Sequence, residues 1–396
     1  MINYLFTSIL LFLVLIITLK YIYSSRKRLP LPPGPFPWPL IGNLLQIGKT
    51  RPHAALAKLA QVHGPDFMSI RFGTRLIVVA SSPAAAAEVL KTHDRVLSGR
   101  YVSRVGSPVF YESSGVSGRG VGEEMMKYLR EFTETGATQE LADMFPVLGA
   151  ICSMNFQRTR EEKDSQTSMD AVDFVDALVK NGFTDKYINA LLMELFGAGS
   201  ETTIVTSEWM LVDLLKNHQC LTKLRDEIAN VVGDKDVIIR ESDLTNMPYL
   251  DACLKETLRL HPPGPLLLPH RAVETSEVMG YRIPKDTQVM VNMWAIVRDP
   301  KVWDDPSSFK PERFMNSKMD YKGRDFEYIP FGSGRRMCAG EPLASRFVPL
   351  VVASLVHKFD WFLPNDMNPD QIDMDEILDL IISKKDPILV IPKLRK

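Results

Sequence analysis

Apolar and polar positions along the chain predict a mainly α fold with a small β-rich lobe. Alternating apolar residues indicate short strands over Phe67–Phe72, Leu76–Ala80, Val278–Ile283 and Gln288–Asn292. Apolar residues at helical spacing indicate helices over His53–His63, Pro83–His93, Glu123–Phe132, Thr184 to about His218, Leu221–Val232 and Tyr249–Leu260. Irregular connections are expected from Leu97 to Gly122, over Arg158–Ser168 and from Arg298 to Pro330.

The N-terminal residues form the longest apolar run. Ile2 to Leu19 is almost wholly apolar, and Arg26-Lys27-Arg28 follows it, which is the reverse of the order in a signal peptide. The run approaches the length of about 20 residues that a transmembrane helix needs, and basic residues favour the cytosolic side. We therefore expect a membrane anchor at residues 1–23 and a cytosolic remainder; a buried helix of a soluble protein is the alternative.

A proline-rich segment follows this run. Leu29-Pro-Leu-Pro-Pro-Gly-Pro-Phe-Pro-Trp-Pro39 lacks many of the backbone N–H groups that helices and sheets need, which favours a stiff, extended connector. Taken alone, it is equally suited to binding a proline-recognising module. We place a hinge at residues 24–43 and a single domain at residues 44–396.

The composition of the 396 residues limits the classes of function. Apolar residues make up 45% of the chain, which is ample for a packed core, and the net charge of −1 gives no indication of nucleic-acid binding. The cysteines have neither paired spacing nor nearby histidines, so neither a disulfide framework nor a zinc site is indicated.

One cysteine lies in a loop with a distinctive pattern. The sequence Phe331-Gly-Ser-Gly-Arg-Arg-Met-Cys338-Ala-Gly340 precedes a predicted helix that has a proline in its first turn. The positive end of that helix and the two arginines favour a thiolate at Cys338, and a thiolate is a ligand for haem iron. The glycines permit a close approach to a flat macrocycle. An isolated cysteine is more often a small buried apolar residue, but the complete pattern favours a ligand.

The longest predicted helix contains Ala198-Gly199-Ser200-Glu201-Thr202-Thr203 at its centre. Glycine and β-branched threonines are poor helix formers, so this position indicates a groove that admits a ligand and water. The alternative is a surface glutamate beside threonines that bond back to the preceding turn.

With these motifs the chain resembles the cytochrome P450 family, and within it the plant alkaloid hydroxylases. The resemblance is carried by the cysteine loop and by Ile188–Gly199, Lys255–Pro263 and Phe359–Pro364. It implies the cytochrome P450 fold, haem b as the cofactor and Cys338 as the ligand of its iron. It also implies that Thr202 hydrogen-bonds dioxygen and that Glu201 helps to relay protons.

The resemblance implies further roles for individual residues. Glu256, Arg259 and Arg313 form a buried charge network behind the haem; Arg336 and His270 bind its propionates; Phe331, Gly332 and Gly340 adjoin it; and Phe196, Ala198, Gly199, Leu266, Leu267 and Leu380 contact the substrate. Taken alone, Glu256 and Arg259 also fit an ordinary surface pair of a helix, and Arg336 and His270 fit solvated surface groups.

The activity that the resemblance implies is insertion of one oxygen atom from O2 into a small apolar substrate such as an alkaloid. Electrons come from NADPH through NADPH–cytochrome P450 reductase. The expected location is the endoplasmic reticulum membrane, with a single-pass anchor and a cytosolic catalytic domain. Phenol coupling or rearrangement by the same haem chemistry is an alternative outcome.

The chain departs from the family pattern in its middle. The Trp-x-x-x-Arg motif is absent, and helices are missing between about residues 118 and 160. Ala339 replaces a proline after the ligand, and Asp379 replaces a glycine in a pocket loop, where it either pairs with an alkaloid amine or faces solvent. A non-catalytic, truncated remnant with impaired haem binding is therefore a second alternative.

Overall fold

The computed structural model describes residues 29–48, 51–73, 75–100, 174–233, 237–379 and 381–395. The chain divides into two compact units, one of residues 1–101 and 201–396 and one of residues 102–200. The expected anchor, the Glu123–Phe132 helix and the Arg158–Ser168 connection lie outside the described residues. Within the described ranges, no helix combines the length and apolar character needed to cross a bilayer.

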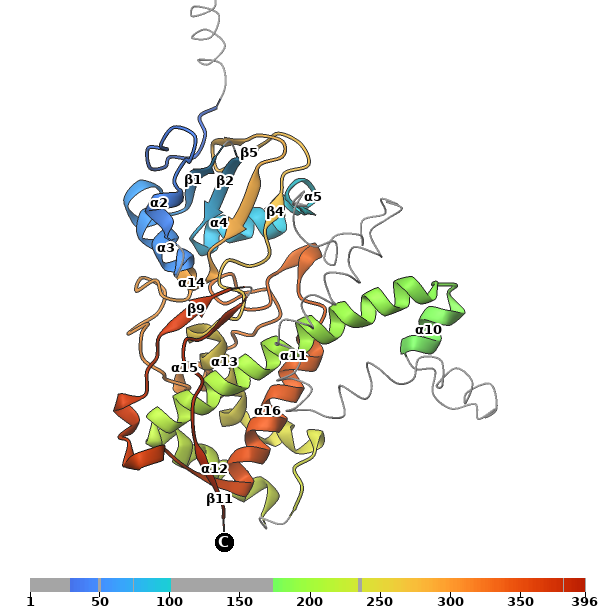
Figure 1. The fold of residues 1–396 in the computed structure, drawn as a ribbon, viewed down its shortest axis with the longest axis vertical. Helices are drawn as coiled ribbons and strands as arrows, with labels where there is room; N and C mark the ends of the chain where they lie inside the picture. The colour runs from blue at the N-terminus through green and yellow to red at the C-terminus, as the bar shows by residue number, and fades with distance from the viewer. Residues whose placement is uncertain are drawn as a thin grey trace, which may run out of the picture. The chain divides into compact units, whose positions relative to one another are not determined.

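A five-stranded sheet forms one layer of the first unit (Figure 1). Its strands follow the order β1 (Phe67–Phe72), β2 (Arg75–Ala80), β7 (Gln288–Val291), β4 (His270–Arg271) and β3 (Gly99–Arg100). The β2–β7 pair is parallel, and the other pairs are antiparallel. Leu56 and Ala60 of α3 (Pro52–His63) share a buried apolar cluster with Met68 and Ile77 of the sheet. The predicted strands β1 and β2 are thus confirmed, because their apolar residues are buried against a helix.

The predicted Pro83–His93 helix forms, but its geometry changes along its length. Ser82 caps α4 (Pro83–Ala87) by accepting a hydrogen bond from the N–H of Ala85, and the helix then continues as a π-helical turn, η1 (Glu88–Thr92). The short α5 (Asp94–Leu97) follows.

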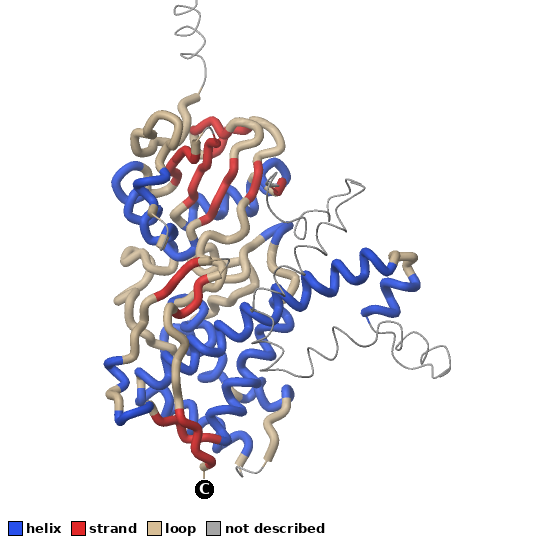
Figure 2. Tube along the Cα trace, in the orientation of Figure 1, coloured by secondary structure: helices blue, strands red, loops and turns tan. Residues whose placement is uncertain are grey.

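Long helices make up the part of this unit away from the five-stranded sheet (Figure 2). They are α12 (His218–Val232), α13 (Pro248–Leu260), α16 (Glu341–Lys358) and the part of α11 (Asp185–Lys216) from Glu201 onward. Leu214, Leu224, Leu254 and Val352 from these four helices share one buried core. The packing confirms the mainly helical fold with small sheets that the apolar spacing predicts.

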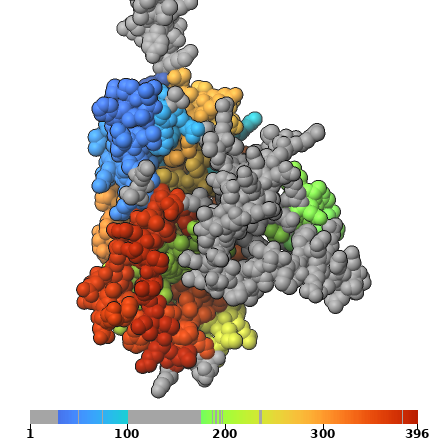
Figure 3. Space-filling view, in the orientation of Figure 1, coloured from blue at the N-terminus to red at the C-terminus, as the bar shows by residue number. Residues whose placement is uncertain are grey.

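The remaining described elements are short. They are α2 (Leu44–Ile47), η4 (Glu241–Asn246), β5 (Ser276–Val278), β6 (Tyr281–Ile283), α14 (Met293–Ile296), α15 (Glu312–Met315), η5 (Gly334–Arg336), β8 (Phe359–Phe362), η6 (Pro364–Asp366), η7 (Pro369–Gln371), β9 (Glu376–Leu378), β10 (Ile382–Lys384) and β11 (Ile391–Leu394). In the space-filling view, the C-terminal residues, in red, make up much of the visible surface of this unit (Figure 3). The described part of the second unit is α10 (Phe174–Lys180) and the first half of α11.

Two expected connections contain structure that the sequence pattern does not predict. The segment Arg298–Pro330 holds α15, and the segment from Leu97 holds β3, which is only two residues long. Both elements are too short to show a period in the sequence, so their neighbours decide their conformation.

Candidate functional site

The cysteine loop is closed by its own backbone. The N–H of Cys338 donates to the carbonyl of Phe331 at 2.9 Å, and the N–H of Met337 donates to that of Gly334 at 3.2 Å. Cys338 is exposed. It lies two residues before Gly340, which precedes α16 and accepts a hydrogen bond from the N–H of Ala344 at 2.9 Å. The loop therefore presents its thiol to the outside, next to the N-terminal end of a long helix, as predicted.

Two glycines shape this loop, for different reasons. Gly334 has a φ of +69°, and a Cβ there would lie 2.1 Å from the carbonyl oxygen of Leu90 in η1. Gly332 has a φ of +72°, and among the described residues a Cβ there would meet only Cδ1 of Leu267, at 3.9 Å. Gly334 thus lets the loop pack on η1, and Gly332 has no described neighbour closer than Leu267 on the side where a Cβ would stand.

The two arginines of the loop bond to the segment that follows η1. Nε of Arg335 lies 2.8 Å from Oδ2 of Asp94, and Nε of Arg336 donates to the carbonyl of Ser98 at 3.1 Å. These bonds tie the cysteine loop to α5 and β3. The sequence pattern predicts that both arginines lie near Cys338, but it gives no indication of these partners.

His270, one of the predicted propionate ligands, lies buried in the same region. Its Nδ1 lies 2.7 Å from the carbonyl oxygen of Leu97, and β4, which contains it, pairs with β3. Burial, chiefly, and then the positive charges of Arg100 and Arg336 lower the pKa of His270 to about 4, although the bond to Leu97 acts in the opposite direction. Two arginines and a histidine therefore converge here.

Arg100 is the member of this group that sequence reasoning missed. Its NH1 donates to the carbonyl oxygens of Leu268 and Pro269 at 2.9 and 3.2 Å. In the sequence it stands at the start of a glycine- and serine-rich stretch with no motif around it. Only the pairing of β3 with β4 brings it to His270.

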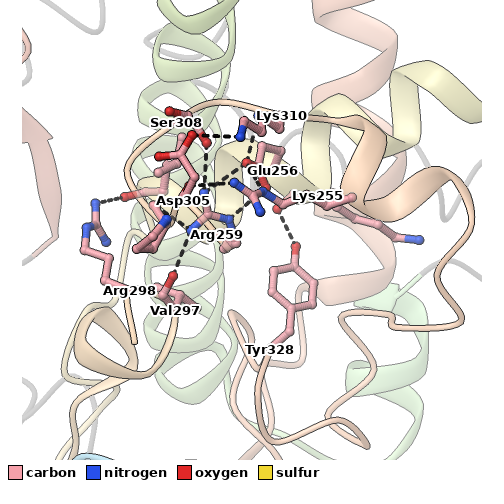
Figure 4. Close-up of polar contacts among 12 residues, drawn as sticks. Lys255, Glu256, Arg259, Val297, Arg298, Asp305, Ser308, Lys310 and Tyr328 are labelled. Atoms are coloured by element: carbon pink, nitrogen blue, oxygen red, sulfur yellow. Dashed lines mark hydrogen bonds and ion pairs between the residues drawn. The ribbon is translucent and has the colours of Figure 1, made fainter. Parts of the chain in front are cut away.

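The Glu256 cluster lies in the interior of the same unit (Figure 4). Arg259 donates to both carboxylate oxygens of Glu256, at 2.8 and 2.9 Å, and Arg313 donates to Oε1 at 3.1 Å. The side chains of Glu256 and Arg259 are fully buried. Arg259 also donates to the carbonyls of Val297 and Pro306, both at 2.8 Å. The three residues that the resemblance groups together are thus brought into contact, and they bind the segment from Val297 to Arg313 to α13.

The predicted oxygen-activating residues lie on α11. Glu201 is exposed and Thr202 is partly buried. The hydroxyl of Thr206 donates to the carbonyl of Thr202 at 2.7 Å, and that of Ser207 donates to the carbonyl of Thr203 at 2.8 Å. Side-chain bonds of this kind weaken the helical hydrogen-bond ladder at this position, where the sequence predicts a groove.

The predicted substrate residues are described unevenly. Leu266 packs against the apolar cluster of α3 and the sheet, and Leu267 packs against the main core. Ala198 and Gly199 are exposed residues of α11 that belong to the second unit. The side chain of Phe196 and the whole of Leu380 lie outside the described part of the structure.

The residues around Cys338 fit a haem. An exposed thiol is the soft donor that haem iron takes, and the lack of a side chain at Gly332, where among the described residues only Leu267 comes within 4 Å of a Cβ position, allows a flat ring to approach. Arg336 and Arg100 supply the hydrogen-bond donors and positive charge that carboxylates need, whereas His270, whose pKa is lowered to about 4, is neutral and has its Nδ1–H bound to the carbonyl of Leu97. Leu343 and Phe347 of α16, 66% and 49% exposed, add apolar surface beyond the loop.

Comparison with known proteins agrees with this fit. The sequence matches the family profile described as Cytochrome P450 over residues 32–133 and 124–391. It is 42% identical over 467 aligned residues to the probable (S)-N-methylcoclaurine 3'-hydroxylase isozyme 2 of Coptis japonica, covering 94% of each chain. It is 38% identical to corytuberine synthase of Coptis japonica, covering 99% of each. Both alignments are longer than the 396 residues of this chain, so they open gaps in it.

The fold comparison gives the same family. A solved structure of a zebra fish cytochrome P450 with abiraterone superposes with a TM-score of 0.68 and 25% sequence identity, covering 87% of this chain and 99% of that one. The fold similarity therefore extends over most of the chain.

Proposed function

The chain belongs to the cytochrome P450 family of haem-thiolate monooxygenases, and we propose that it hydroxylates a small alkaloid with Cys338 as the thiolate ligand. The observation that carries this proposal is the exposed Cys338 in a backbone-closed loop, at the N-terminal end of α16. The haem, when bound, supplies the activation of O2. The overall reaction consumes the substrate, O2, NADPH and a proton, and it yields the hydroxylated product, water and NADP+.

We assign the protein side chains to three tasks. Arg336 and Arg100 hold the propionates, because both are cationic and converge at one place; His270, the other expected ligand, supports this place through its bond to Leu97 and donates to a propionate only when it is protonated. Glu201 would deliver protons and Thr202 would donate a hydrogen bond during the activation of O2, which is the role that the resemblance implies. Glu256, Arg259 and Arg313 fix the geometry of the segment that leads to the cysteine loop.

The substrate class rests on the relatives. Four of the similar proteins are named (S)-N-methylcoclaurine 3'-hydroxylases, with 38% to 42% identity, and others are named corytuberine synthase and berbamunine synthase. We propose a benzylisoquinoline-type alkaloid as the substrate. The synthase names make oxidative coupling, which adds no oxygen to the product, the second candidate function.

A membrane location and a reductase partner complete the proposal. The described hinge exposes Phe36, Trp38 and Leu40, with 79%, 56% and 94% of their surface accessible, and the adjoining helix α2 exposes Leu45, at 75%. Aromatic and aliphatic side chains of this kind suit a lipid–water interface, and the apolar run Ile2–Leu19 lies just ahead of them in the sequence. We propose the endoplasmic reticulum membrane and electron supply by NADPH–cytochrome P450 reductase.

Turnover by the full chain tests the function. Membranes that contain the chain and the reductase are supplied with (S)-N-methylcoclaurine, NADPH and isotopically labelled O2, and the products are analysed by mass spectrometry. We expect a product that carries one labelled oxygen atom. A product that has lost hydrogen without gaining oxygen favours coupling, and the absence of any NADPH-dependent product from a haem-loaded protein contradicts the proposal.

A further inference from the structure

The β9–β10 hairpin carries two buried charges at its base. In this antiparallel pair, Glu376 of β9 stands opposite Lys384 of β10, and both residues are only about one-twentieth exposed. The tip between the strands contains Asp379 and Ile381. Removing two charged residues from water costs free energy, and only well-placed partners offset this cost. The contacts of each residue therefore indicate its role.

Glu376 is bound to the start of α3. Its Oε1 lies 2.8 Å from NH2 of Arg51 and 3.0 Å from Nε2 of His53, and His53 is fully buried. Burial alone raises the pKa of Glu376, but His53, Arg298 and Arg51 together lower it to about 2, so the carboxylate stays ionised. The first strand of the hairpin is therefore fixed to α3 by a charged contact that spans 323 positions of sequence.

Lys384 is bound to α11. Its Nζ lies 5.2 Å from the ring centroid of Trp209 and donates to the carbonyl of Asp373. Trp209 also stacks on His261, with a centroid distance of 3.8 Å and an interplanar angle of 2°. Glu208, the residue before Trp209, accepts a hydrogen bond from the N–H of Ile388 at 2.9 Å. The second strand is thus fixed to α11 by a cation–π contact and by the segment that follows it.

Other charged side chains surround Lys384 and the stacked rings of Trp209 and His261. Glu208, Asp373 and Asp386 favour the cationic form of Lys384, whereas burial, the largest influence, and Lys216 oppose it, with the net effect of lowering its pKa. Asp213 lies beside His261, with Oδ1 3.4 Å from Nε2 of that histidine.

The hairpin approaches the cysteine loop through one intermediate segment. The N–H of Ile382 donates to the carbonyl of Pro263 at 2.9 Å. Four residues later, Leu267 lies beside Gly332 of the cysteine loop. The first residue of β10, next to the tip, is therefore held against the same segment that adjoins the proposed haem site.

We propose that Glu376 and Lys384 are positioning residues that set the hairpin tip against the substrate. This proposal rests on the proposed function. Each charge fixes one strand to a different element, α3 or α11, so the tip has a defined place relative to the Pro263–Leu267 segment. A buried charge gives directional contacts where an apolar side chain gives none, and displacements of about 1 Å near a substrate change rates by up to about 100-fold.

Hydrogen exchange tests the positioning directly and does not depend on turnover. Glu376→Gln and Lys384→Met remove one charge each at nearly constant volume, in the full chain. We expect exchange of the Ile382 amide to rise about tenfold or more in both variants, because the hairpin opens locally more often. Lys385→Met is the matched control: Lys385 is the next residue, and it pairs only loosely with Asp375, at 3.9 Å, with both side chains more than half exposed. Unchanged exchange in both variants overturns the proposal.

Ligand binding tests the consequence for the substrate. Absorbance titrations of the haem-loaded variants compare imidazole, which is small, with 4-phenylimidazole, which carries an additional phenyl group. We expect the dissociation constant of 4-phenylimidazole to rise at least about fivefold in both variants and that of imidazole to stay unchanged. The conservative variant Lys384→Arg should bind 4-phenylimidazole as wild type does, because arginine also stacks on tryptophan. Two results contradict the proposal: faster amide exchange with unchanged binding of 4-phenylimidazole, or equally weakened binding of both ligands. Either result means that Glu376 and Lys384 contribute to stability alone. If wild-type protein binds both ligands but oxidises no alkaloid, the proposed function is refuted. The ratio of the 4-phenylimidazole dissociation constants of variant and wild type still tests the role of the hairpin.

Discussion

Arg259 donates two hydrogen bonds to the carboxylate of Glu256, from Nε at 2.8 Å and from NH2 at 2.9 Å, and neither side chain is exposed. The two residues are three positions apart on α13, where the same spacing on a helix surface contributes only about 0.2–0.5 kcal/mol. Here the pair also accepts the N–H of Lys310 and binds Arg313 and three backbone carbonyls of the segment from Val297 to Ser308. Its role is to hold that segment in place.

Removing one member of this pair is expected to be costly, because the remaining charge is left buried. For Glu256→Gln or Arg259→Met we expect a loss of about 3–5 kcal/mol in the free energy of unfolding, visible as a lower urea midpoint. Arg346→Ala is the control: it breaks an ion pair with Glu241 in which both side chains are about two-thirds exposed, and it should cost less than about 1 kcal/mol. Equal losses for the buried and the exposed pair contradict this account.

The contact of Gly334 with η1 leads to a second prediction. Gly334→Ala places a methyl group 2.1 Å from the carbonyl oxygen of Leu90 and also strains a φ of +69°. Gly280→Ala introduces a similar strain, at a φ of +77°, without any described atom within 4 Å. The left-handed conformation alone costs about 1–2 kcal/mol, so we expect Gly280→Ala to stay near that value and Gly334→Ala to exceed it and lower haem content. Thermal unfolding and the haem-to-protein ratio measure both effects.

Burial of His270 predicts a dependence of stability on pH. Its pKa in the folded protein, about 4, is below the ordinary value of 6.5, so the unfolded chain binds more protons between these values. Its contribution to stability is therefore fully present above about pH 6.5, and it is lost as the pH falls through that window toward 4. His270→Asn keeps a donor for the carbonyl of Leu97 but does not titrate. Urea unfolding at each pH measures the free energy of unfolding of the haem-free proteins. Between pH 6.5 and 5, we expect this free energy to fall by up to about 2 kcal/mol less in the variant than in wild type. Parallel pH profiles contradict the assignment.

The assignment of Thr202 predicts a loss of coupling between NADPH consumption and product. Thr202→Val preserves the shape of the side chain but removes its hydroxyl, and we expect product formed per NADPH to fall about tenfold or more while peroxide rises. Thr206→Val is the control, because the hydroxyl of Thr206 is already bound to the carbonyl of Thr202. Coupling that falls equally in both variants indicates a disturbed helix and not a role for the Thr202 hydroxyl.

The parts of the fold that the sequence predicts are those with strong local periodicity. Strand β1 has the bounds that its alternation indicates, and α11 and α13 begin and end within about two residues of prediction. The π-helical turn at Glu88–Thr92 and the two-residue β3 leave no such pattern, because they depend on packing and pairing with distant residues.

The candidate site shows the same division. The cysteine loop is predictable because its glycines, arginines and ligand lie within ten residues of sequence. Arg100 meets His270 only through strand pairing, and His53 meets Glu376 only because α3 packs near the hairpin. No spacing along the chain encodes contacts of this kind, so they require the folded structure.

The most direct measurement of the central claim is the absorbance spectrum of the reduced full chain with carbon monoxide, for wild type and for Cys338→Ser. We expect wild type to give the strongly red-shifted Soret band of a thiolate-ligated haem and the variant to lose that band while remaining membrane-bound. A band of the histidine-ligated type in wild type, no haem uptake by wild type, or a red-shifted band that persists in Cys338→Ser contradicts the assignment of Cys338 as the iron ligand.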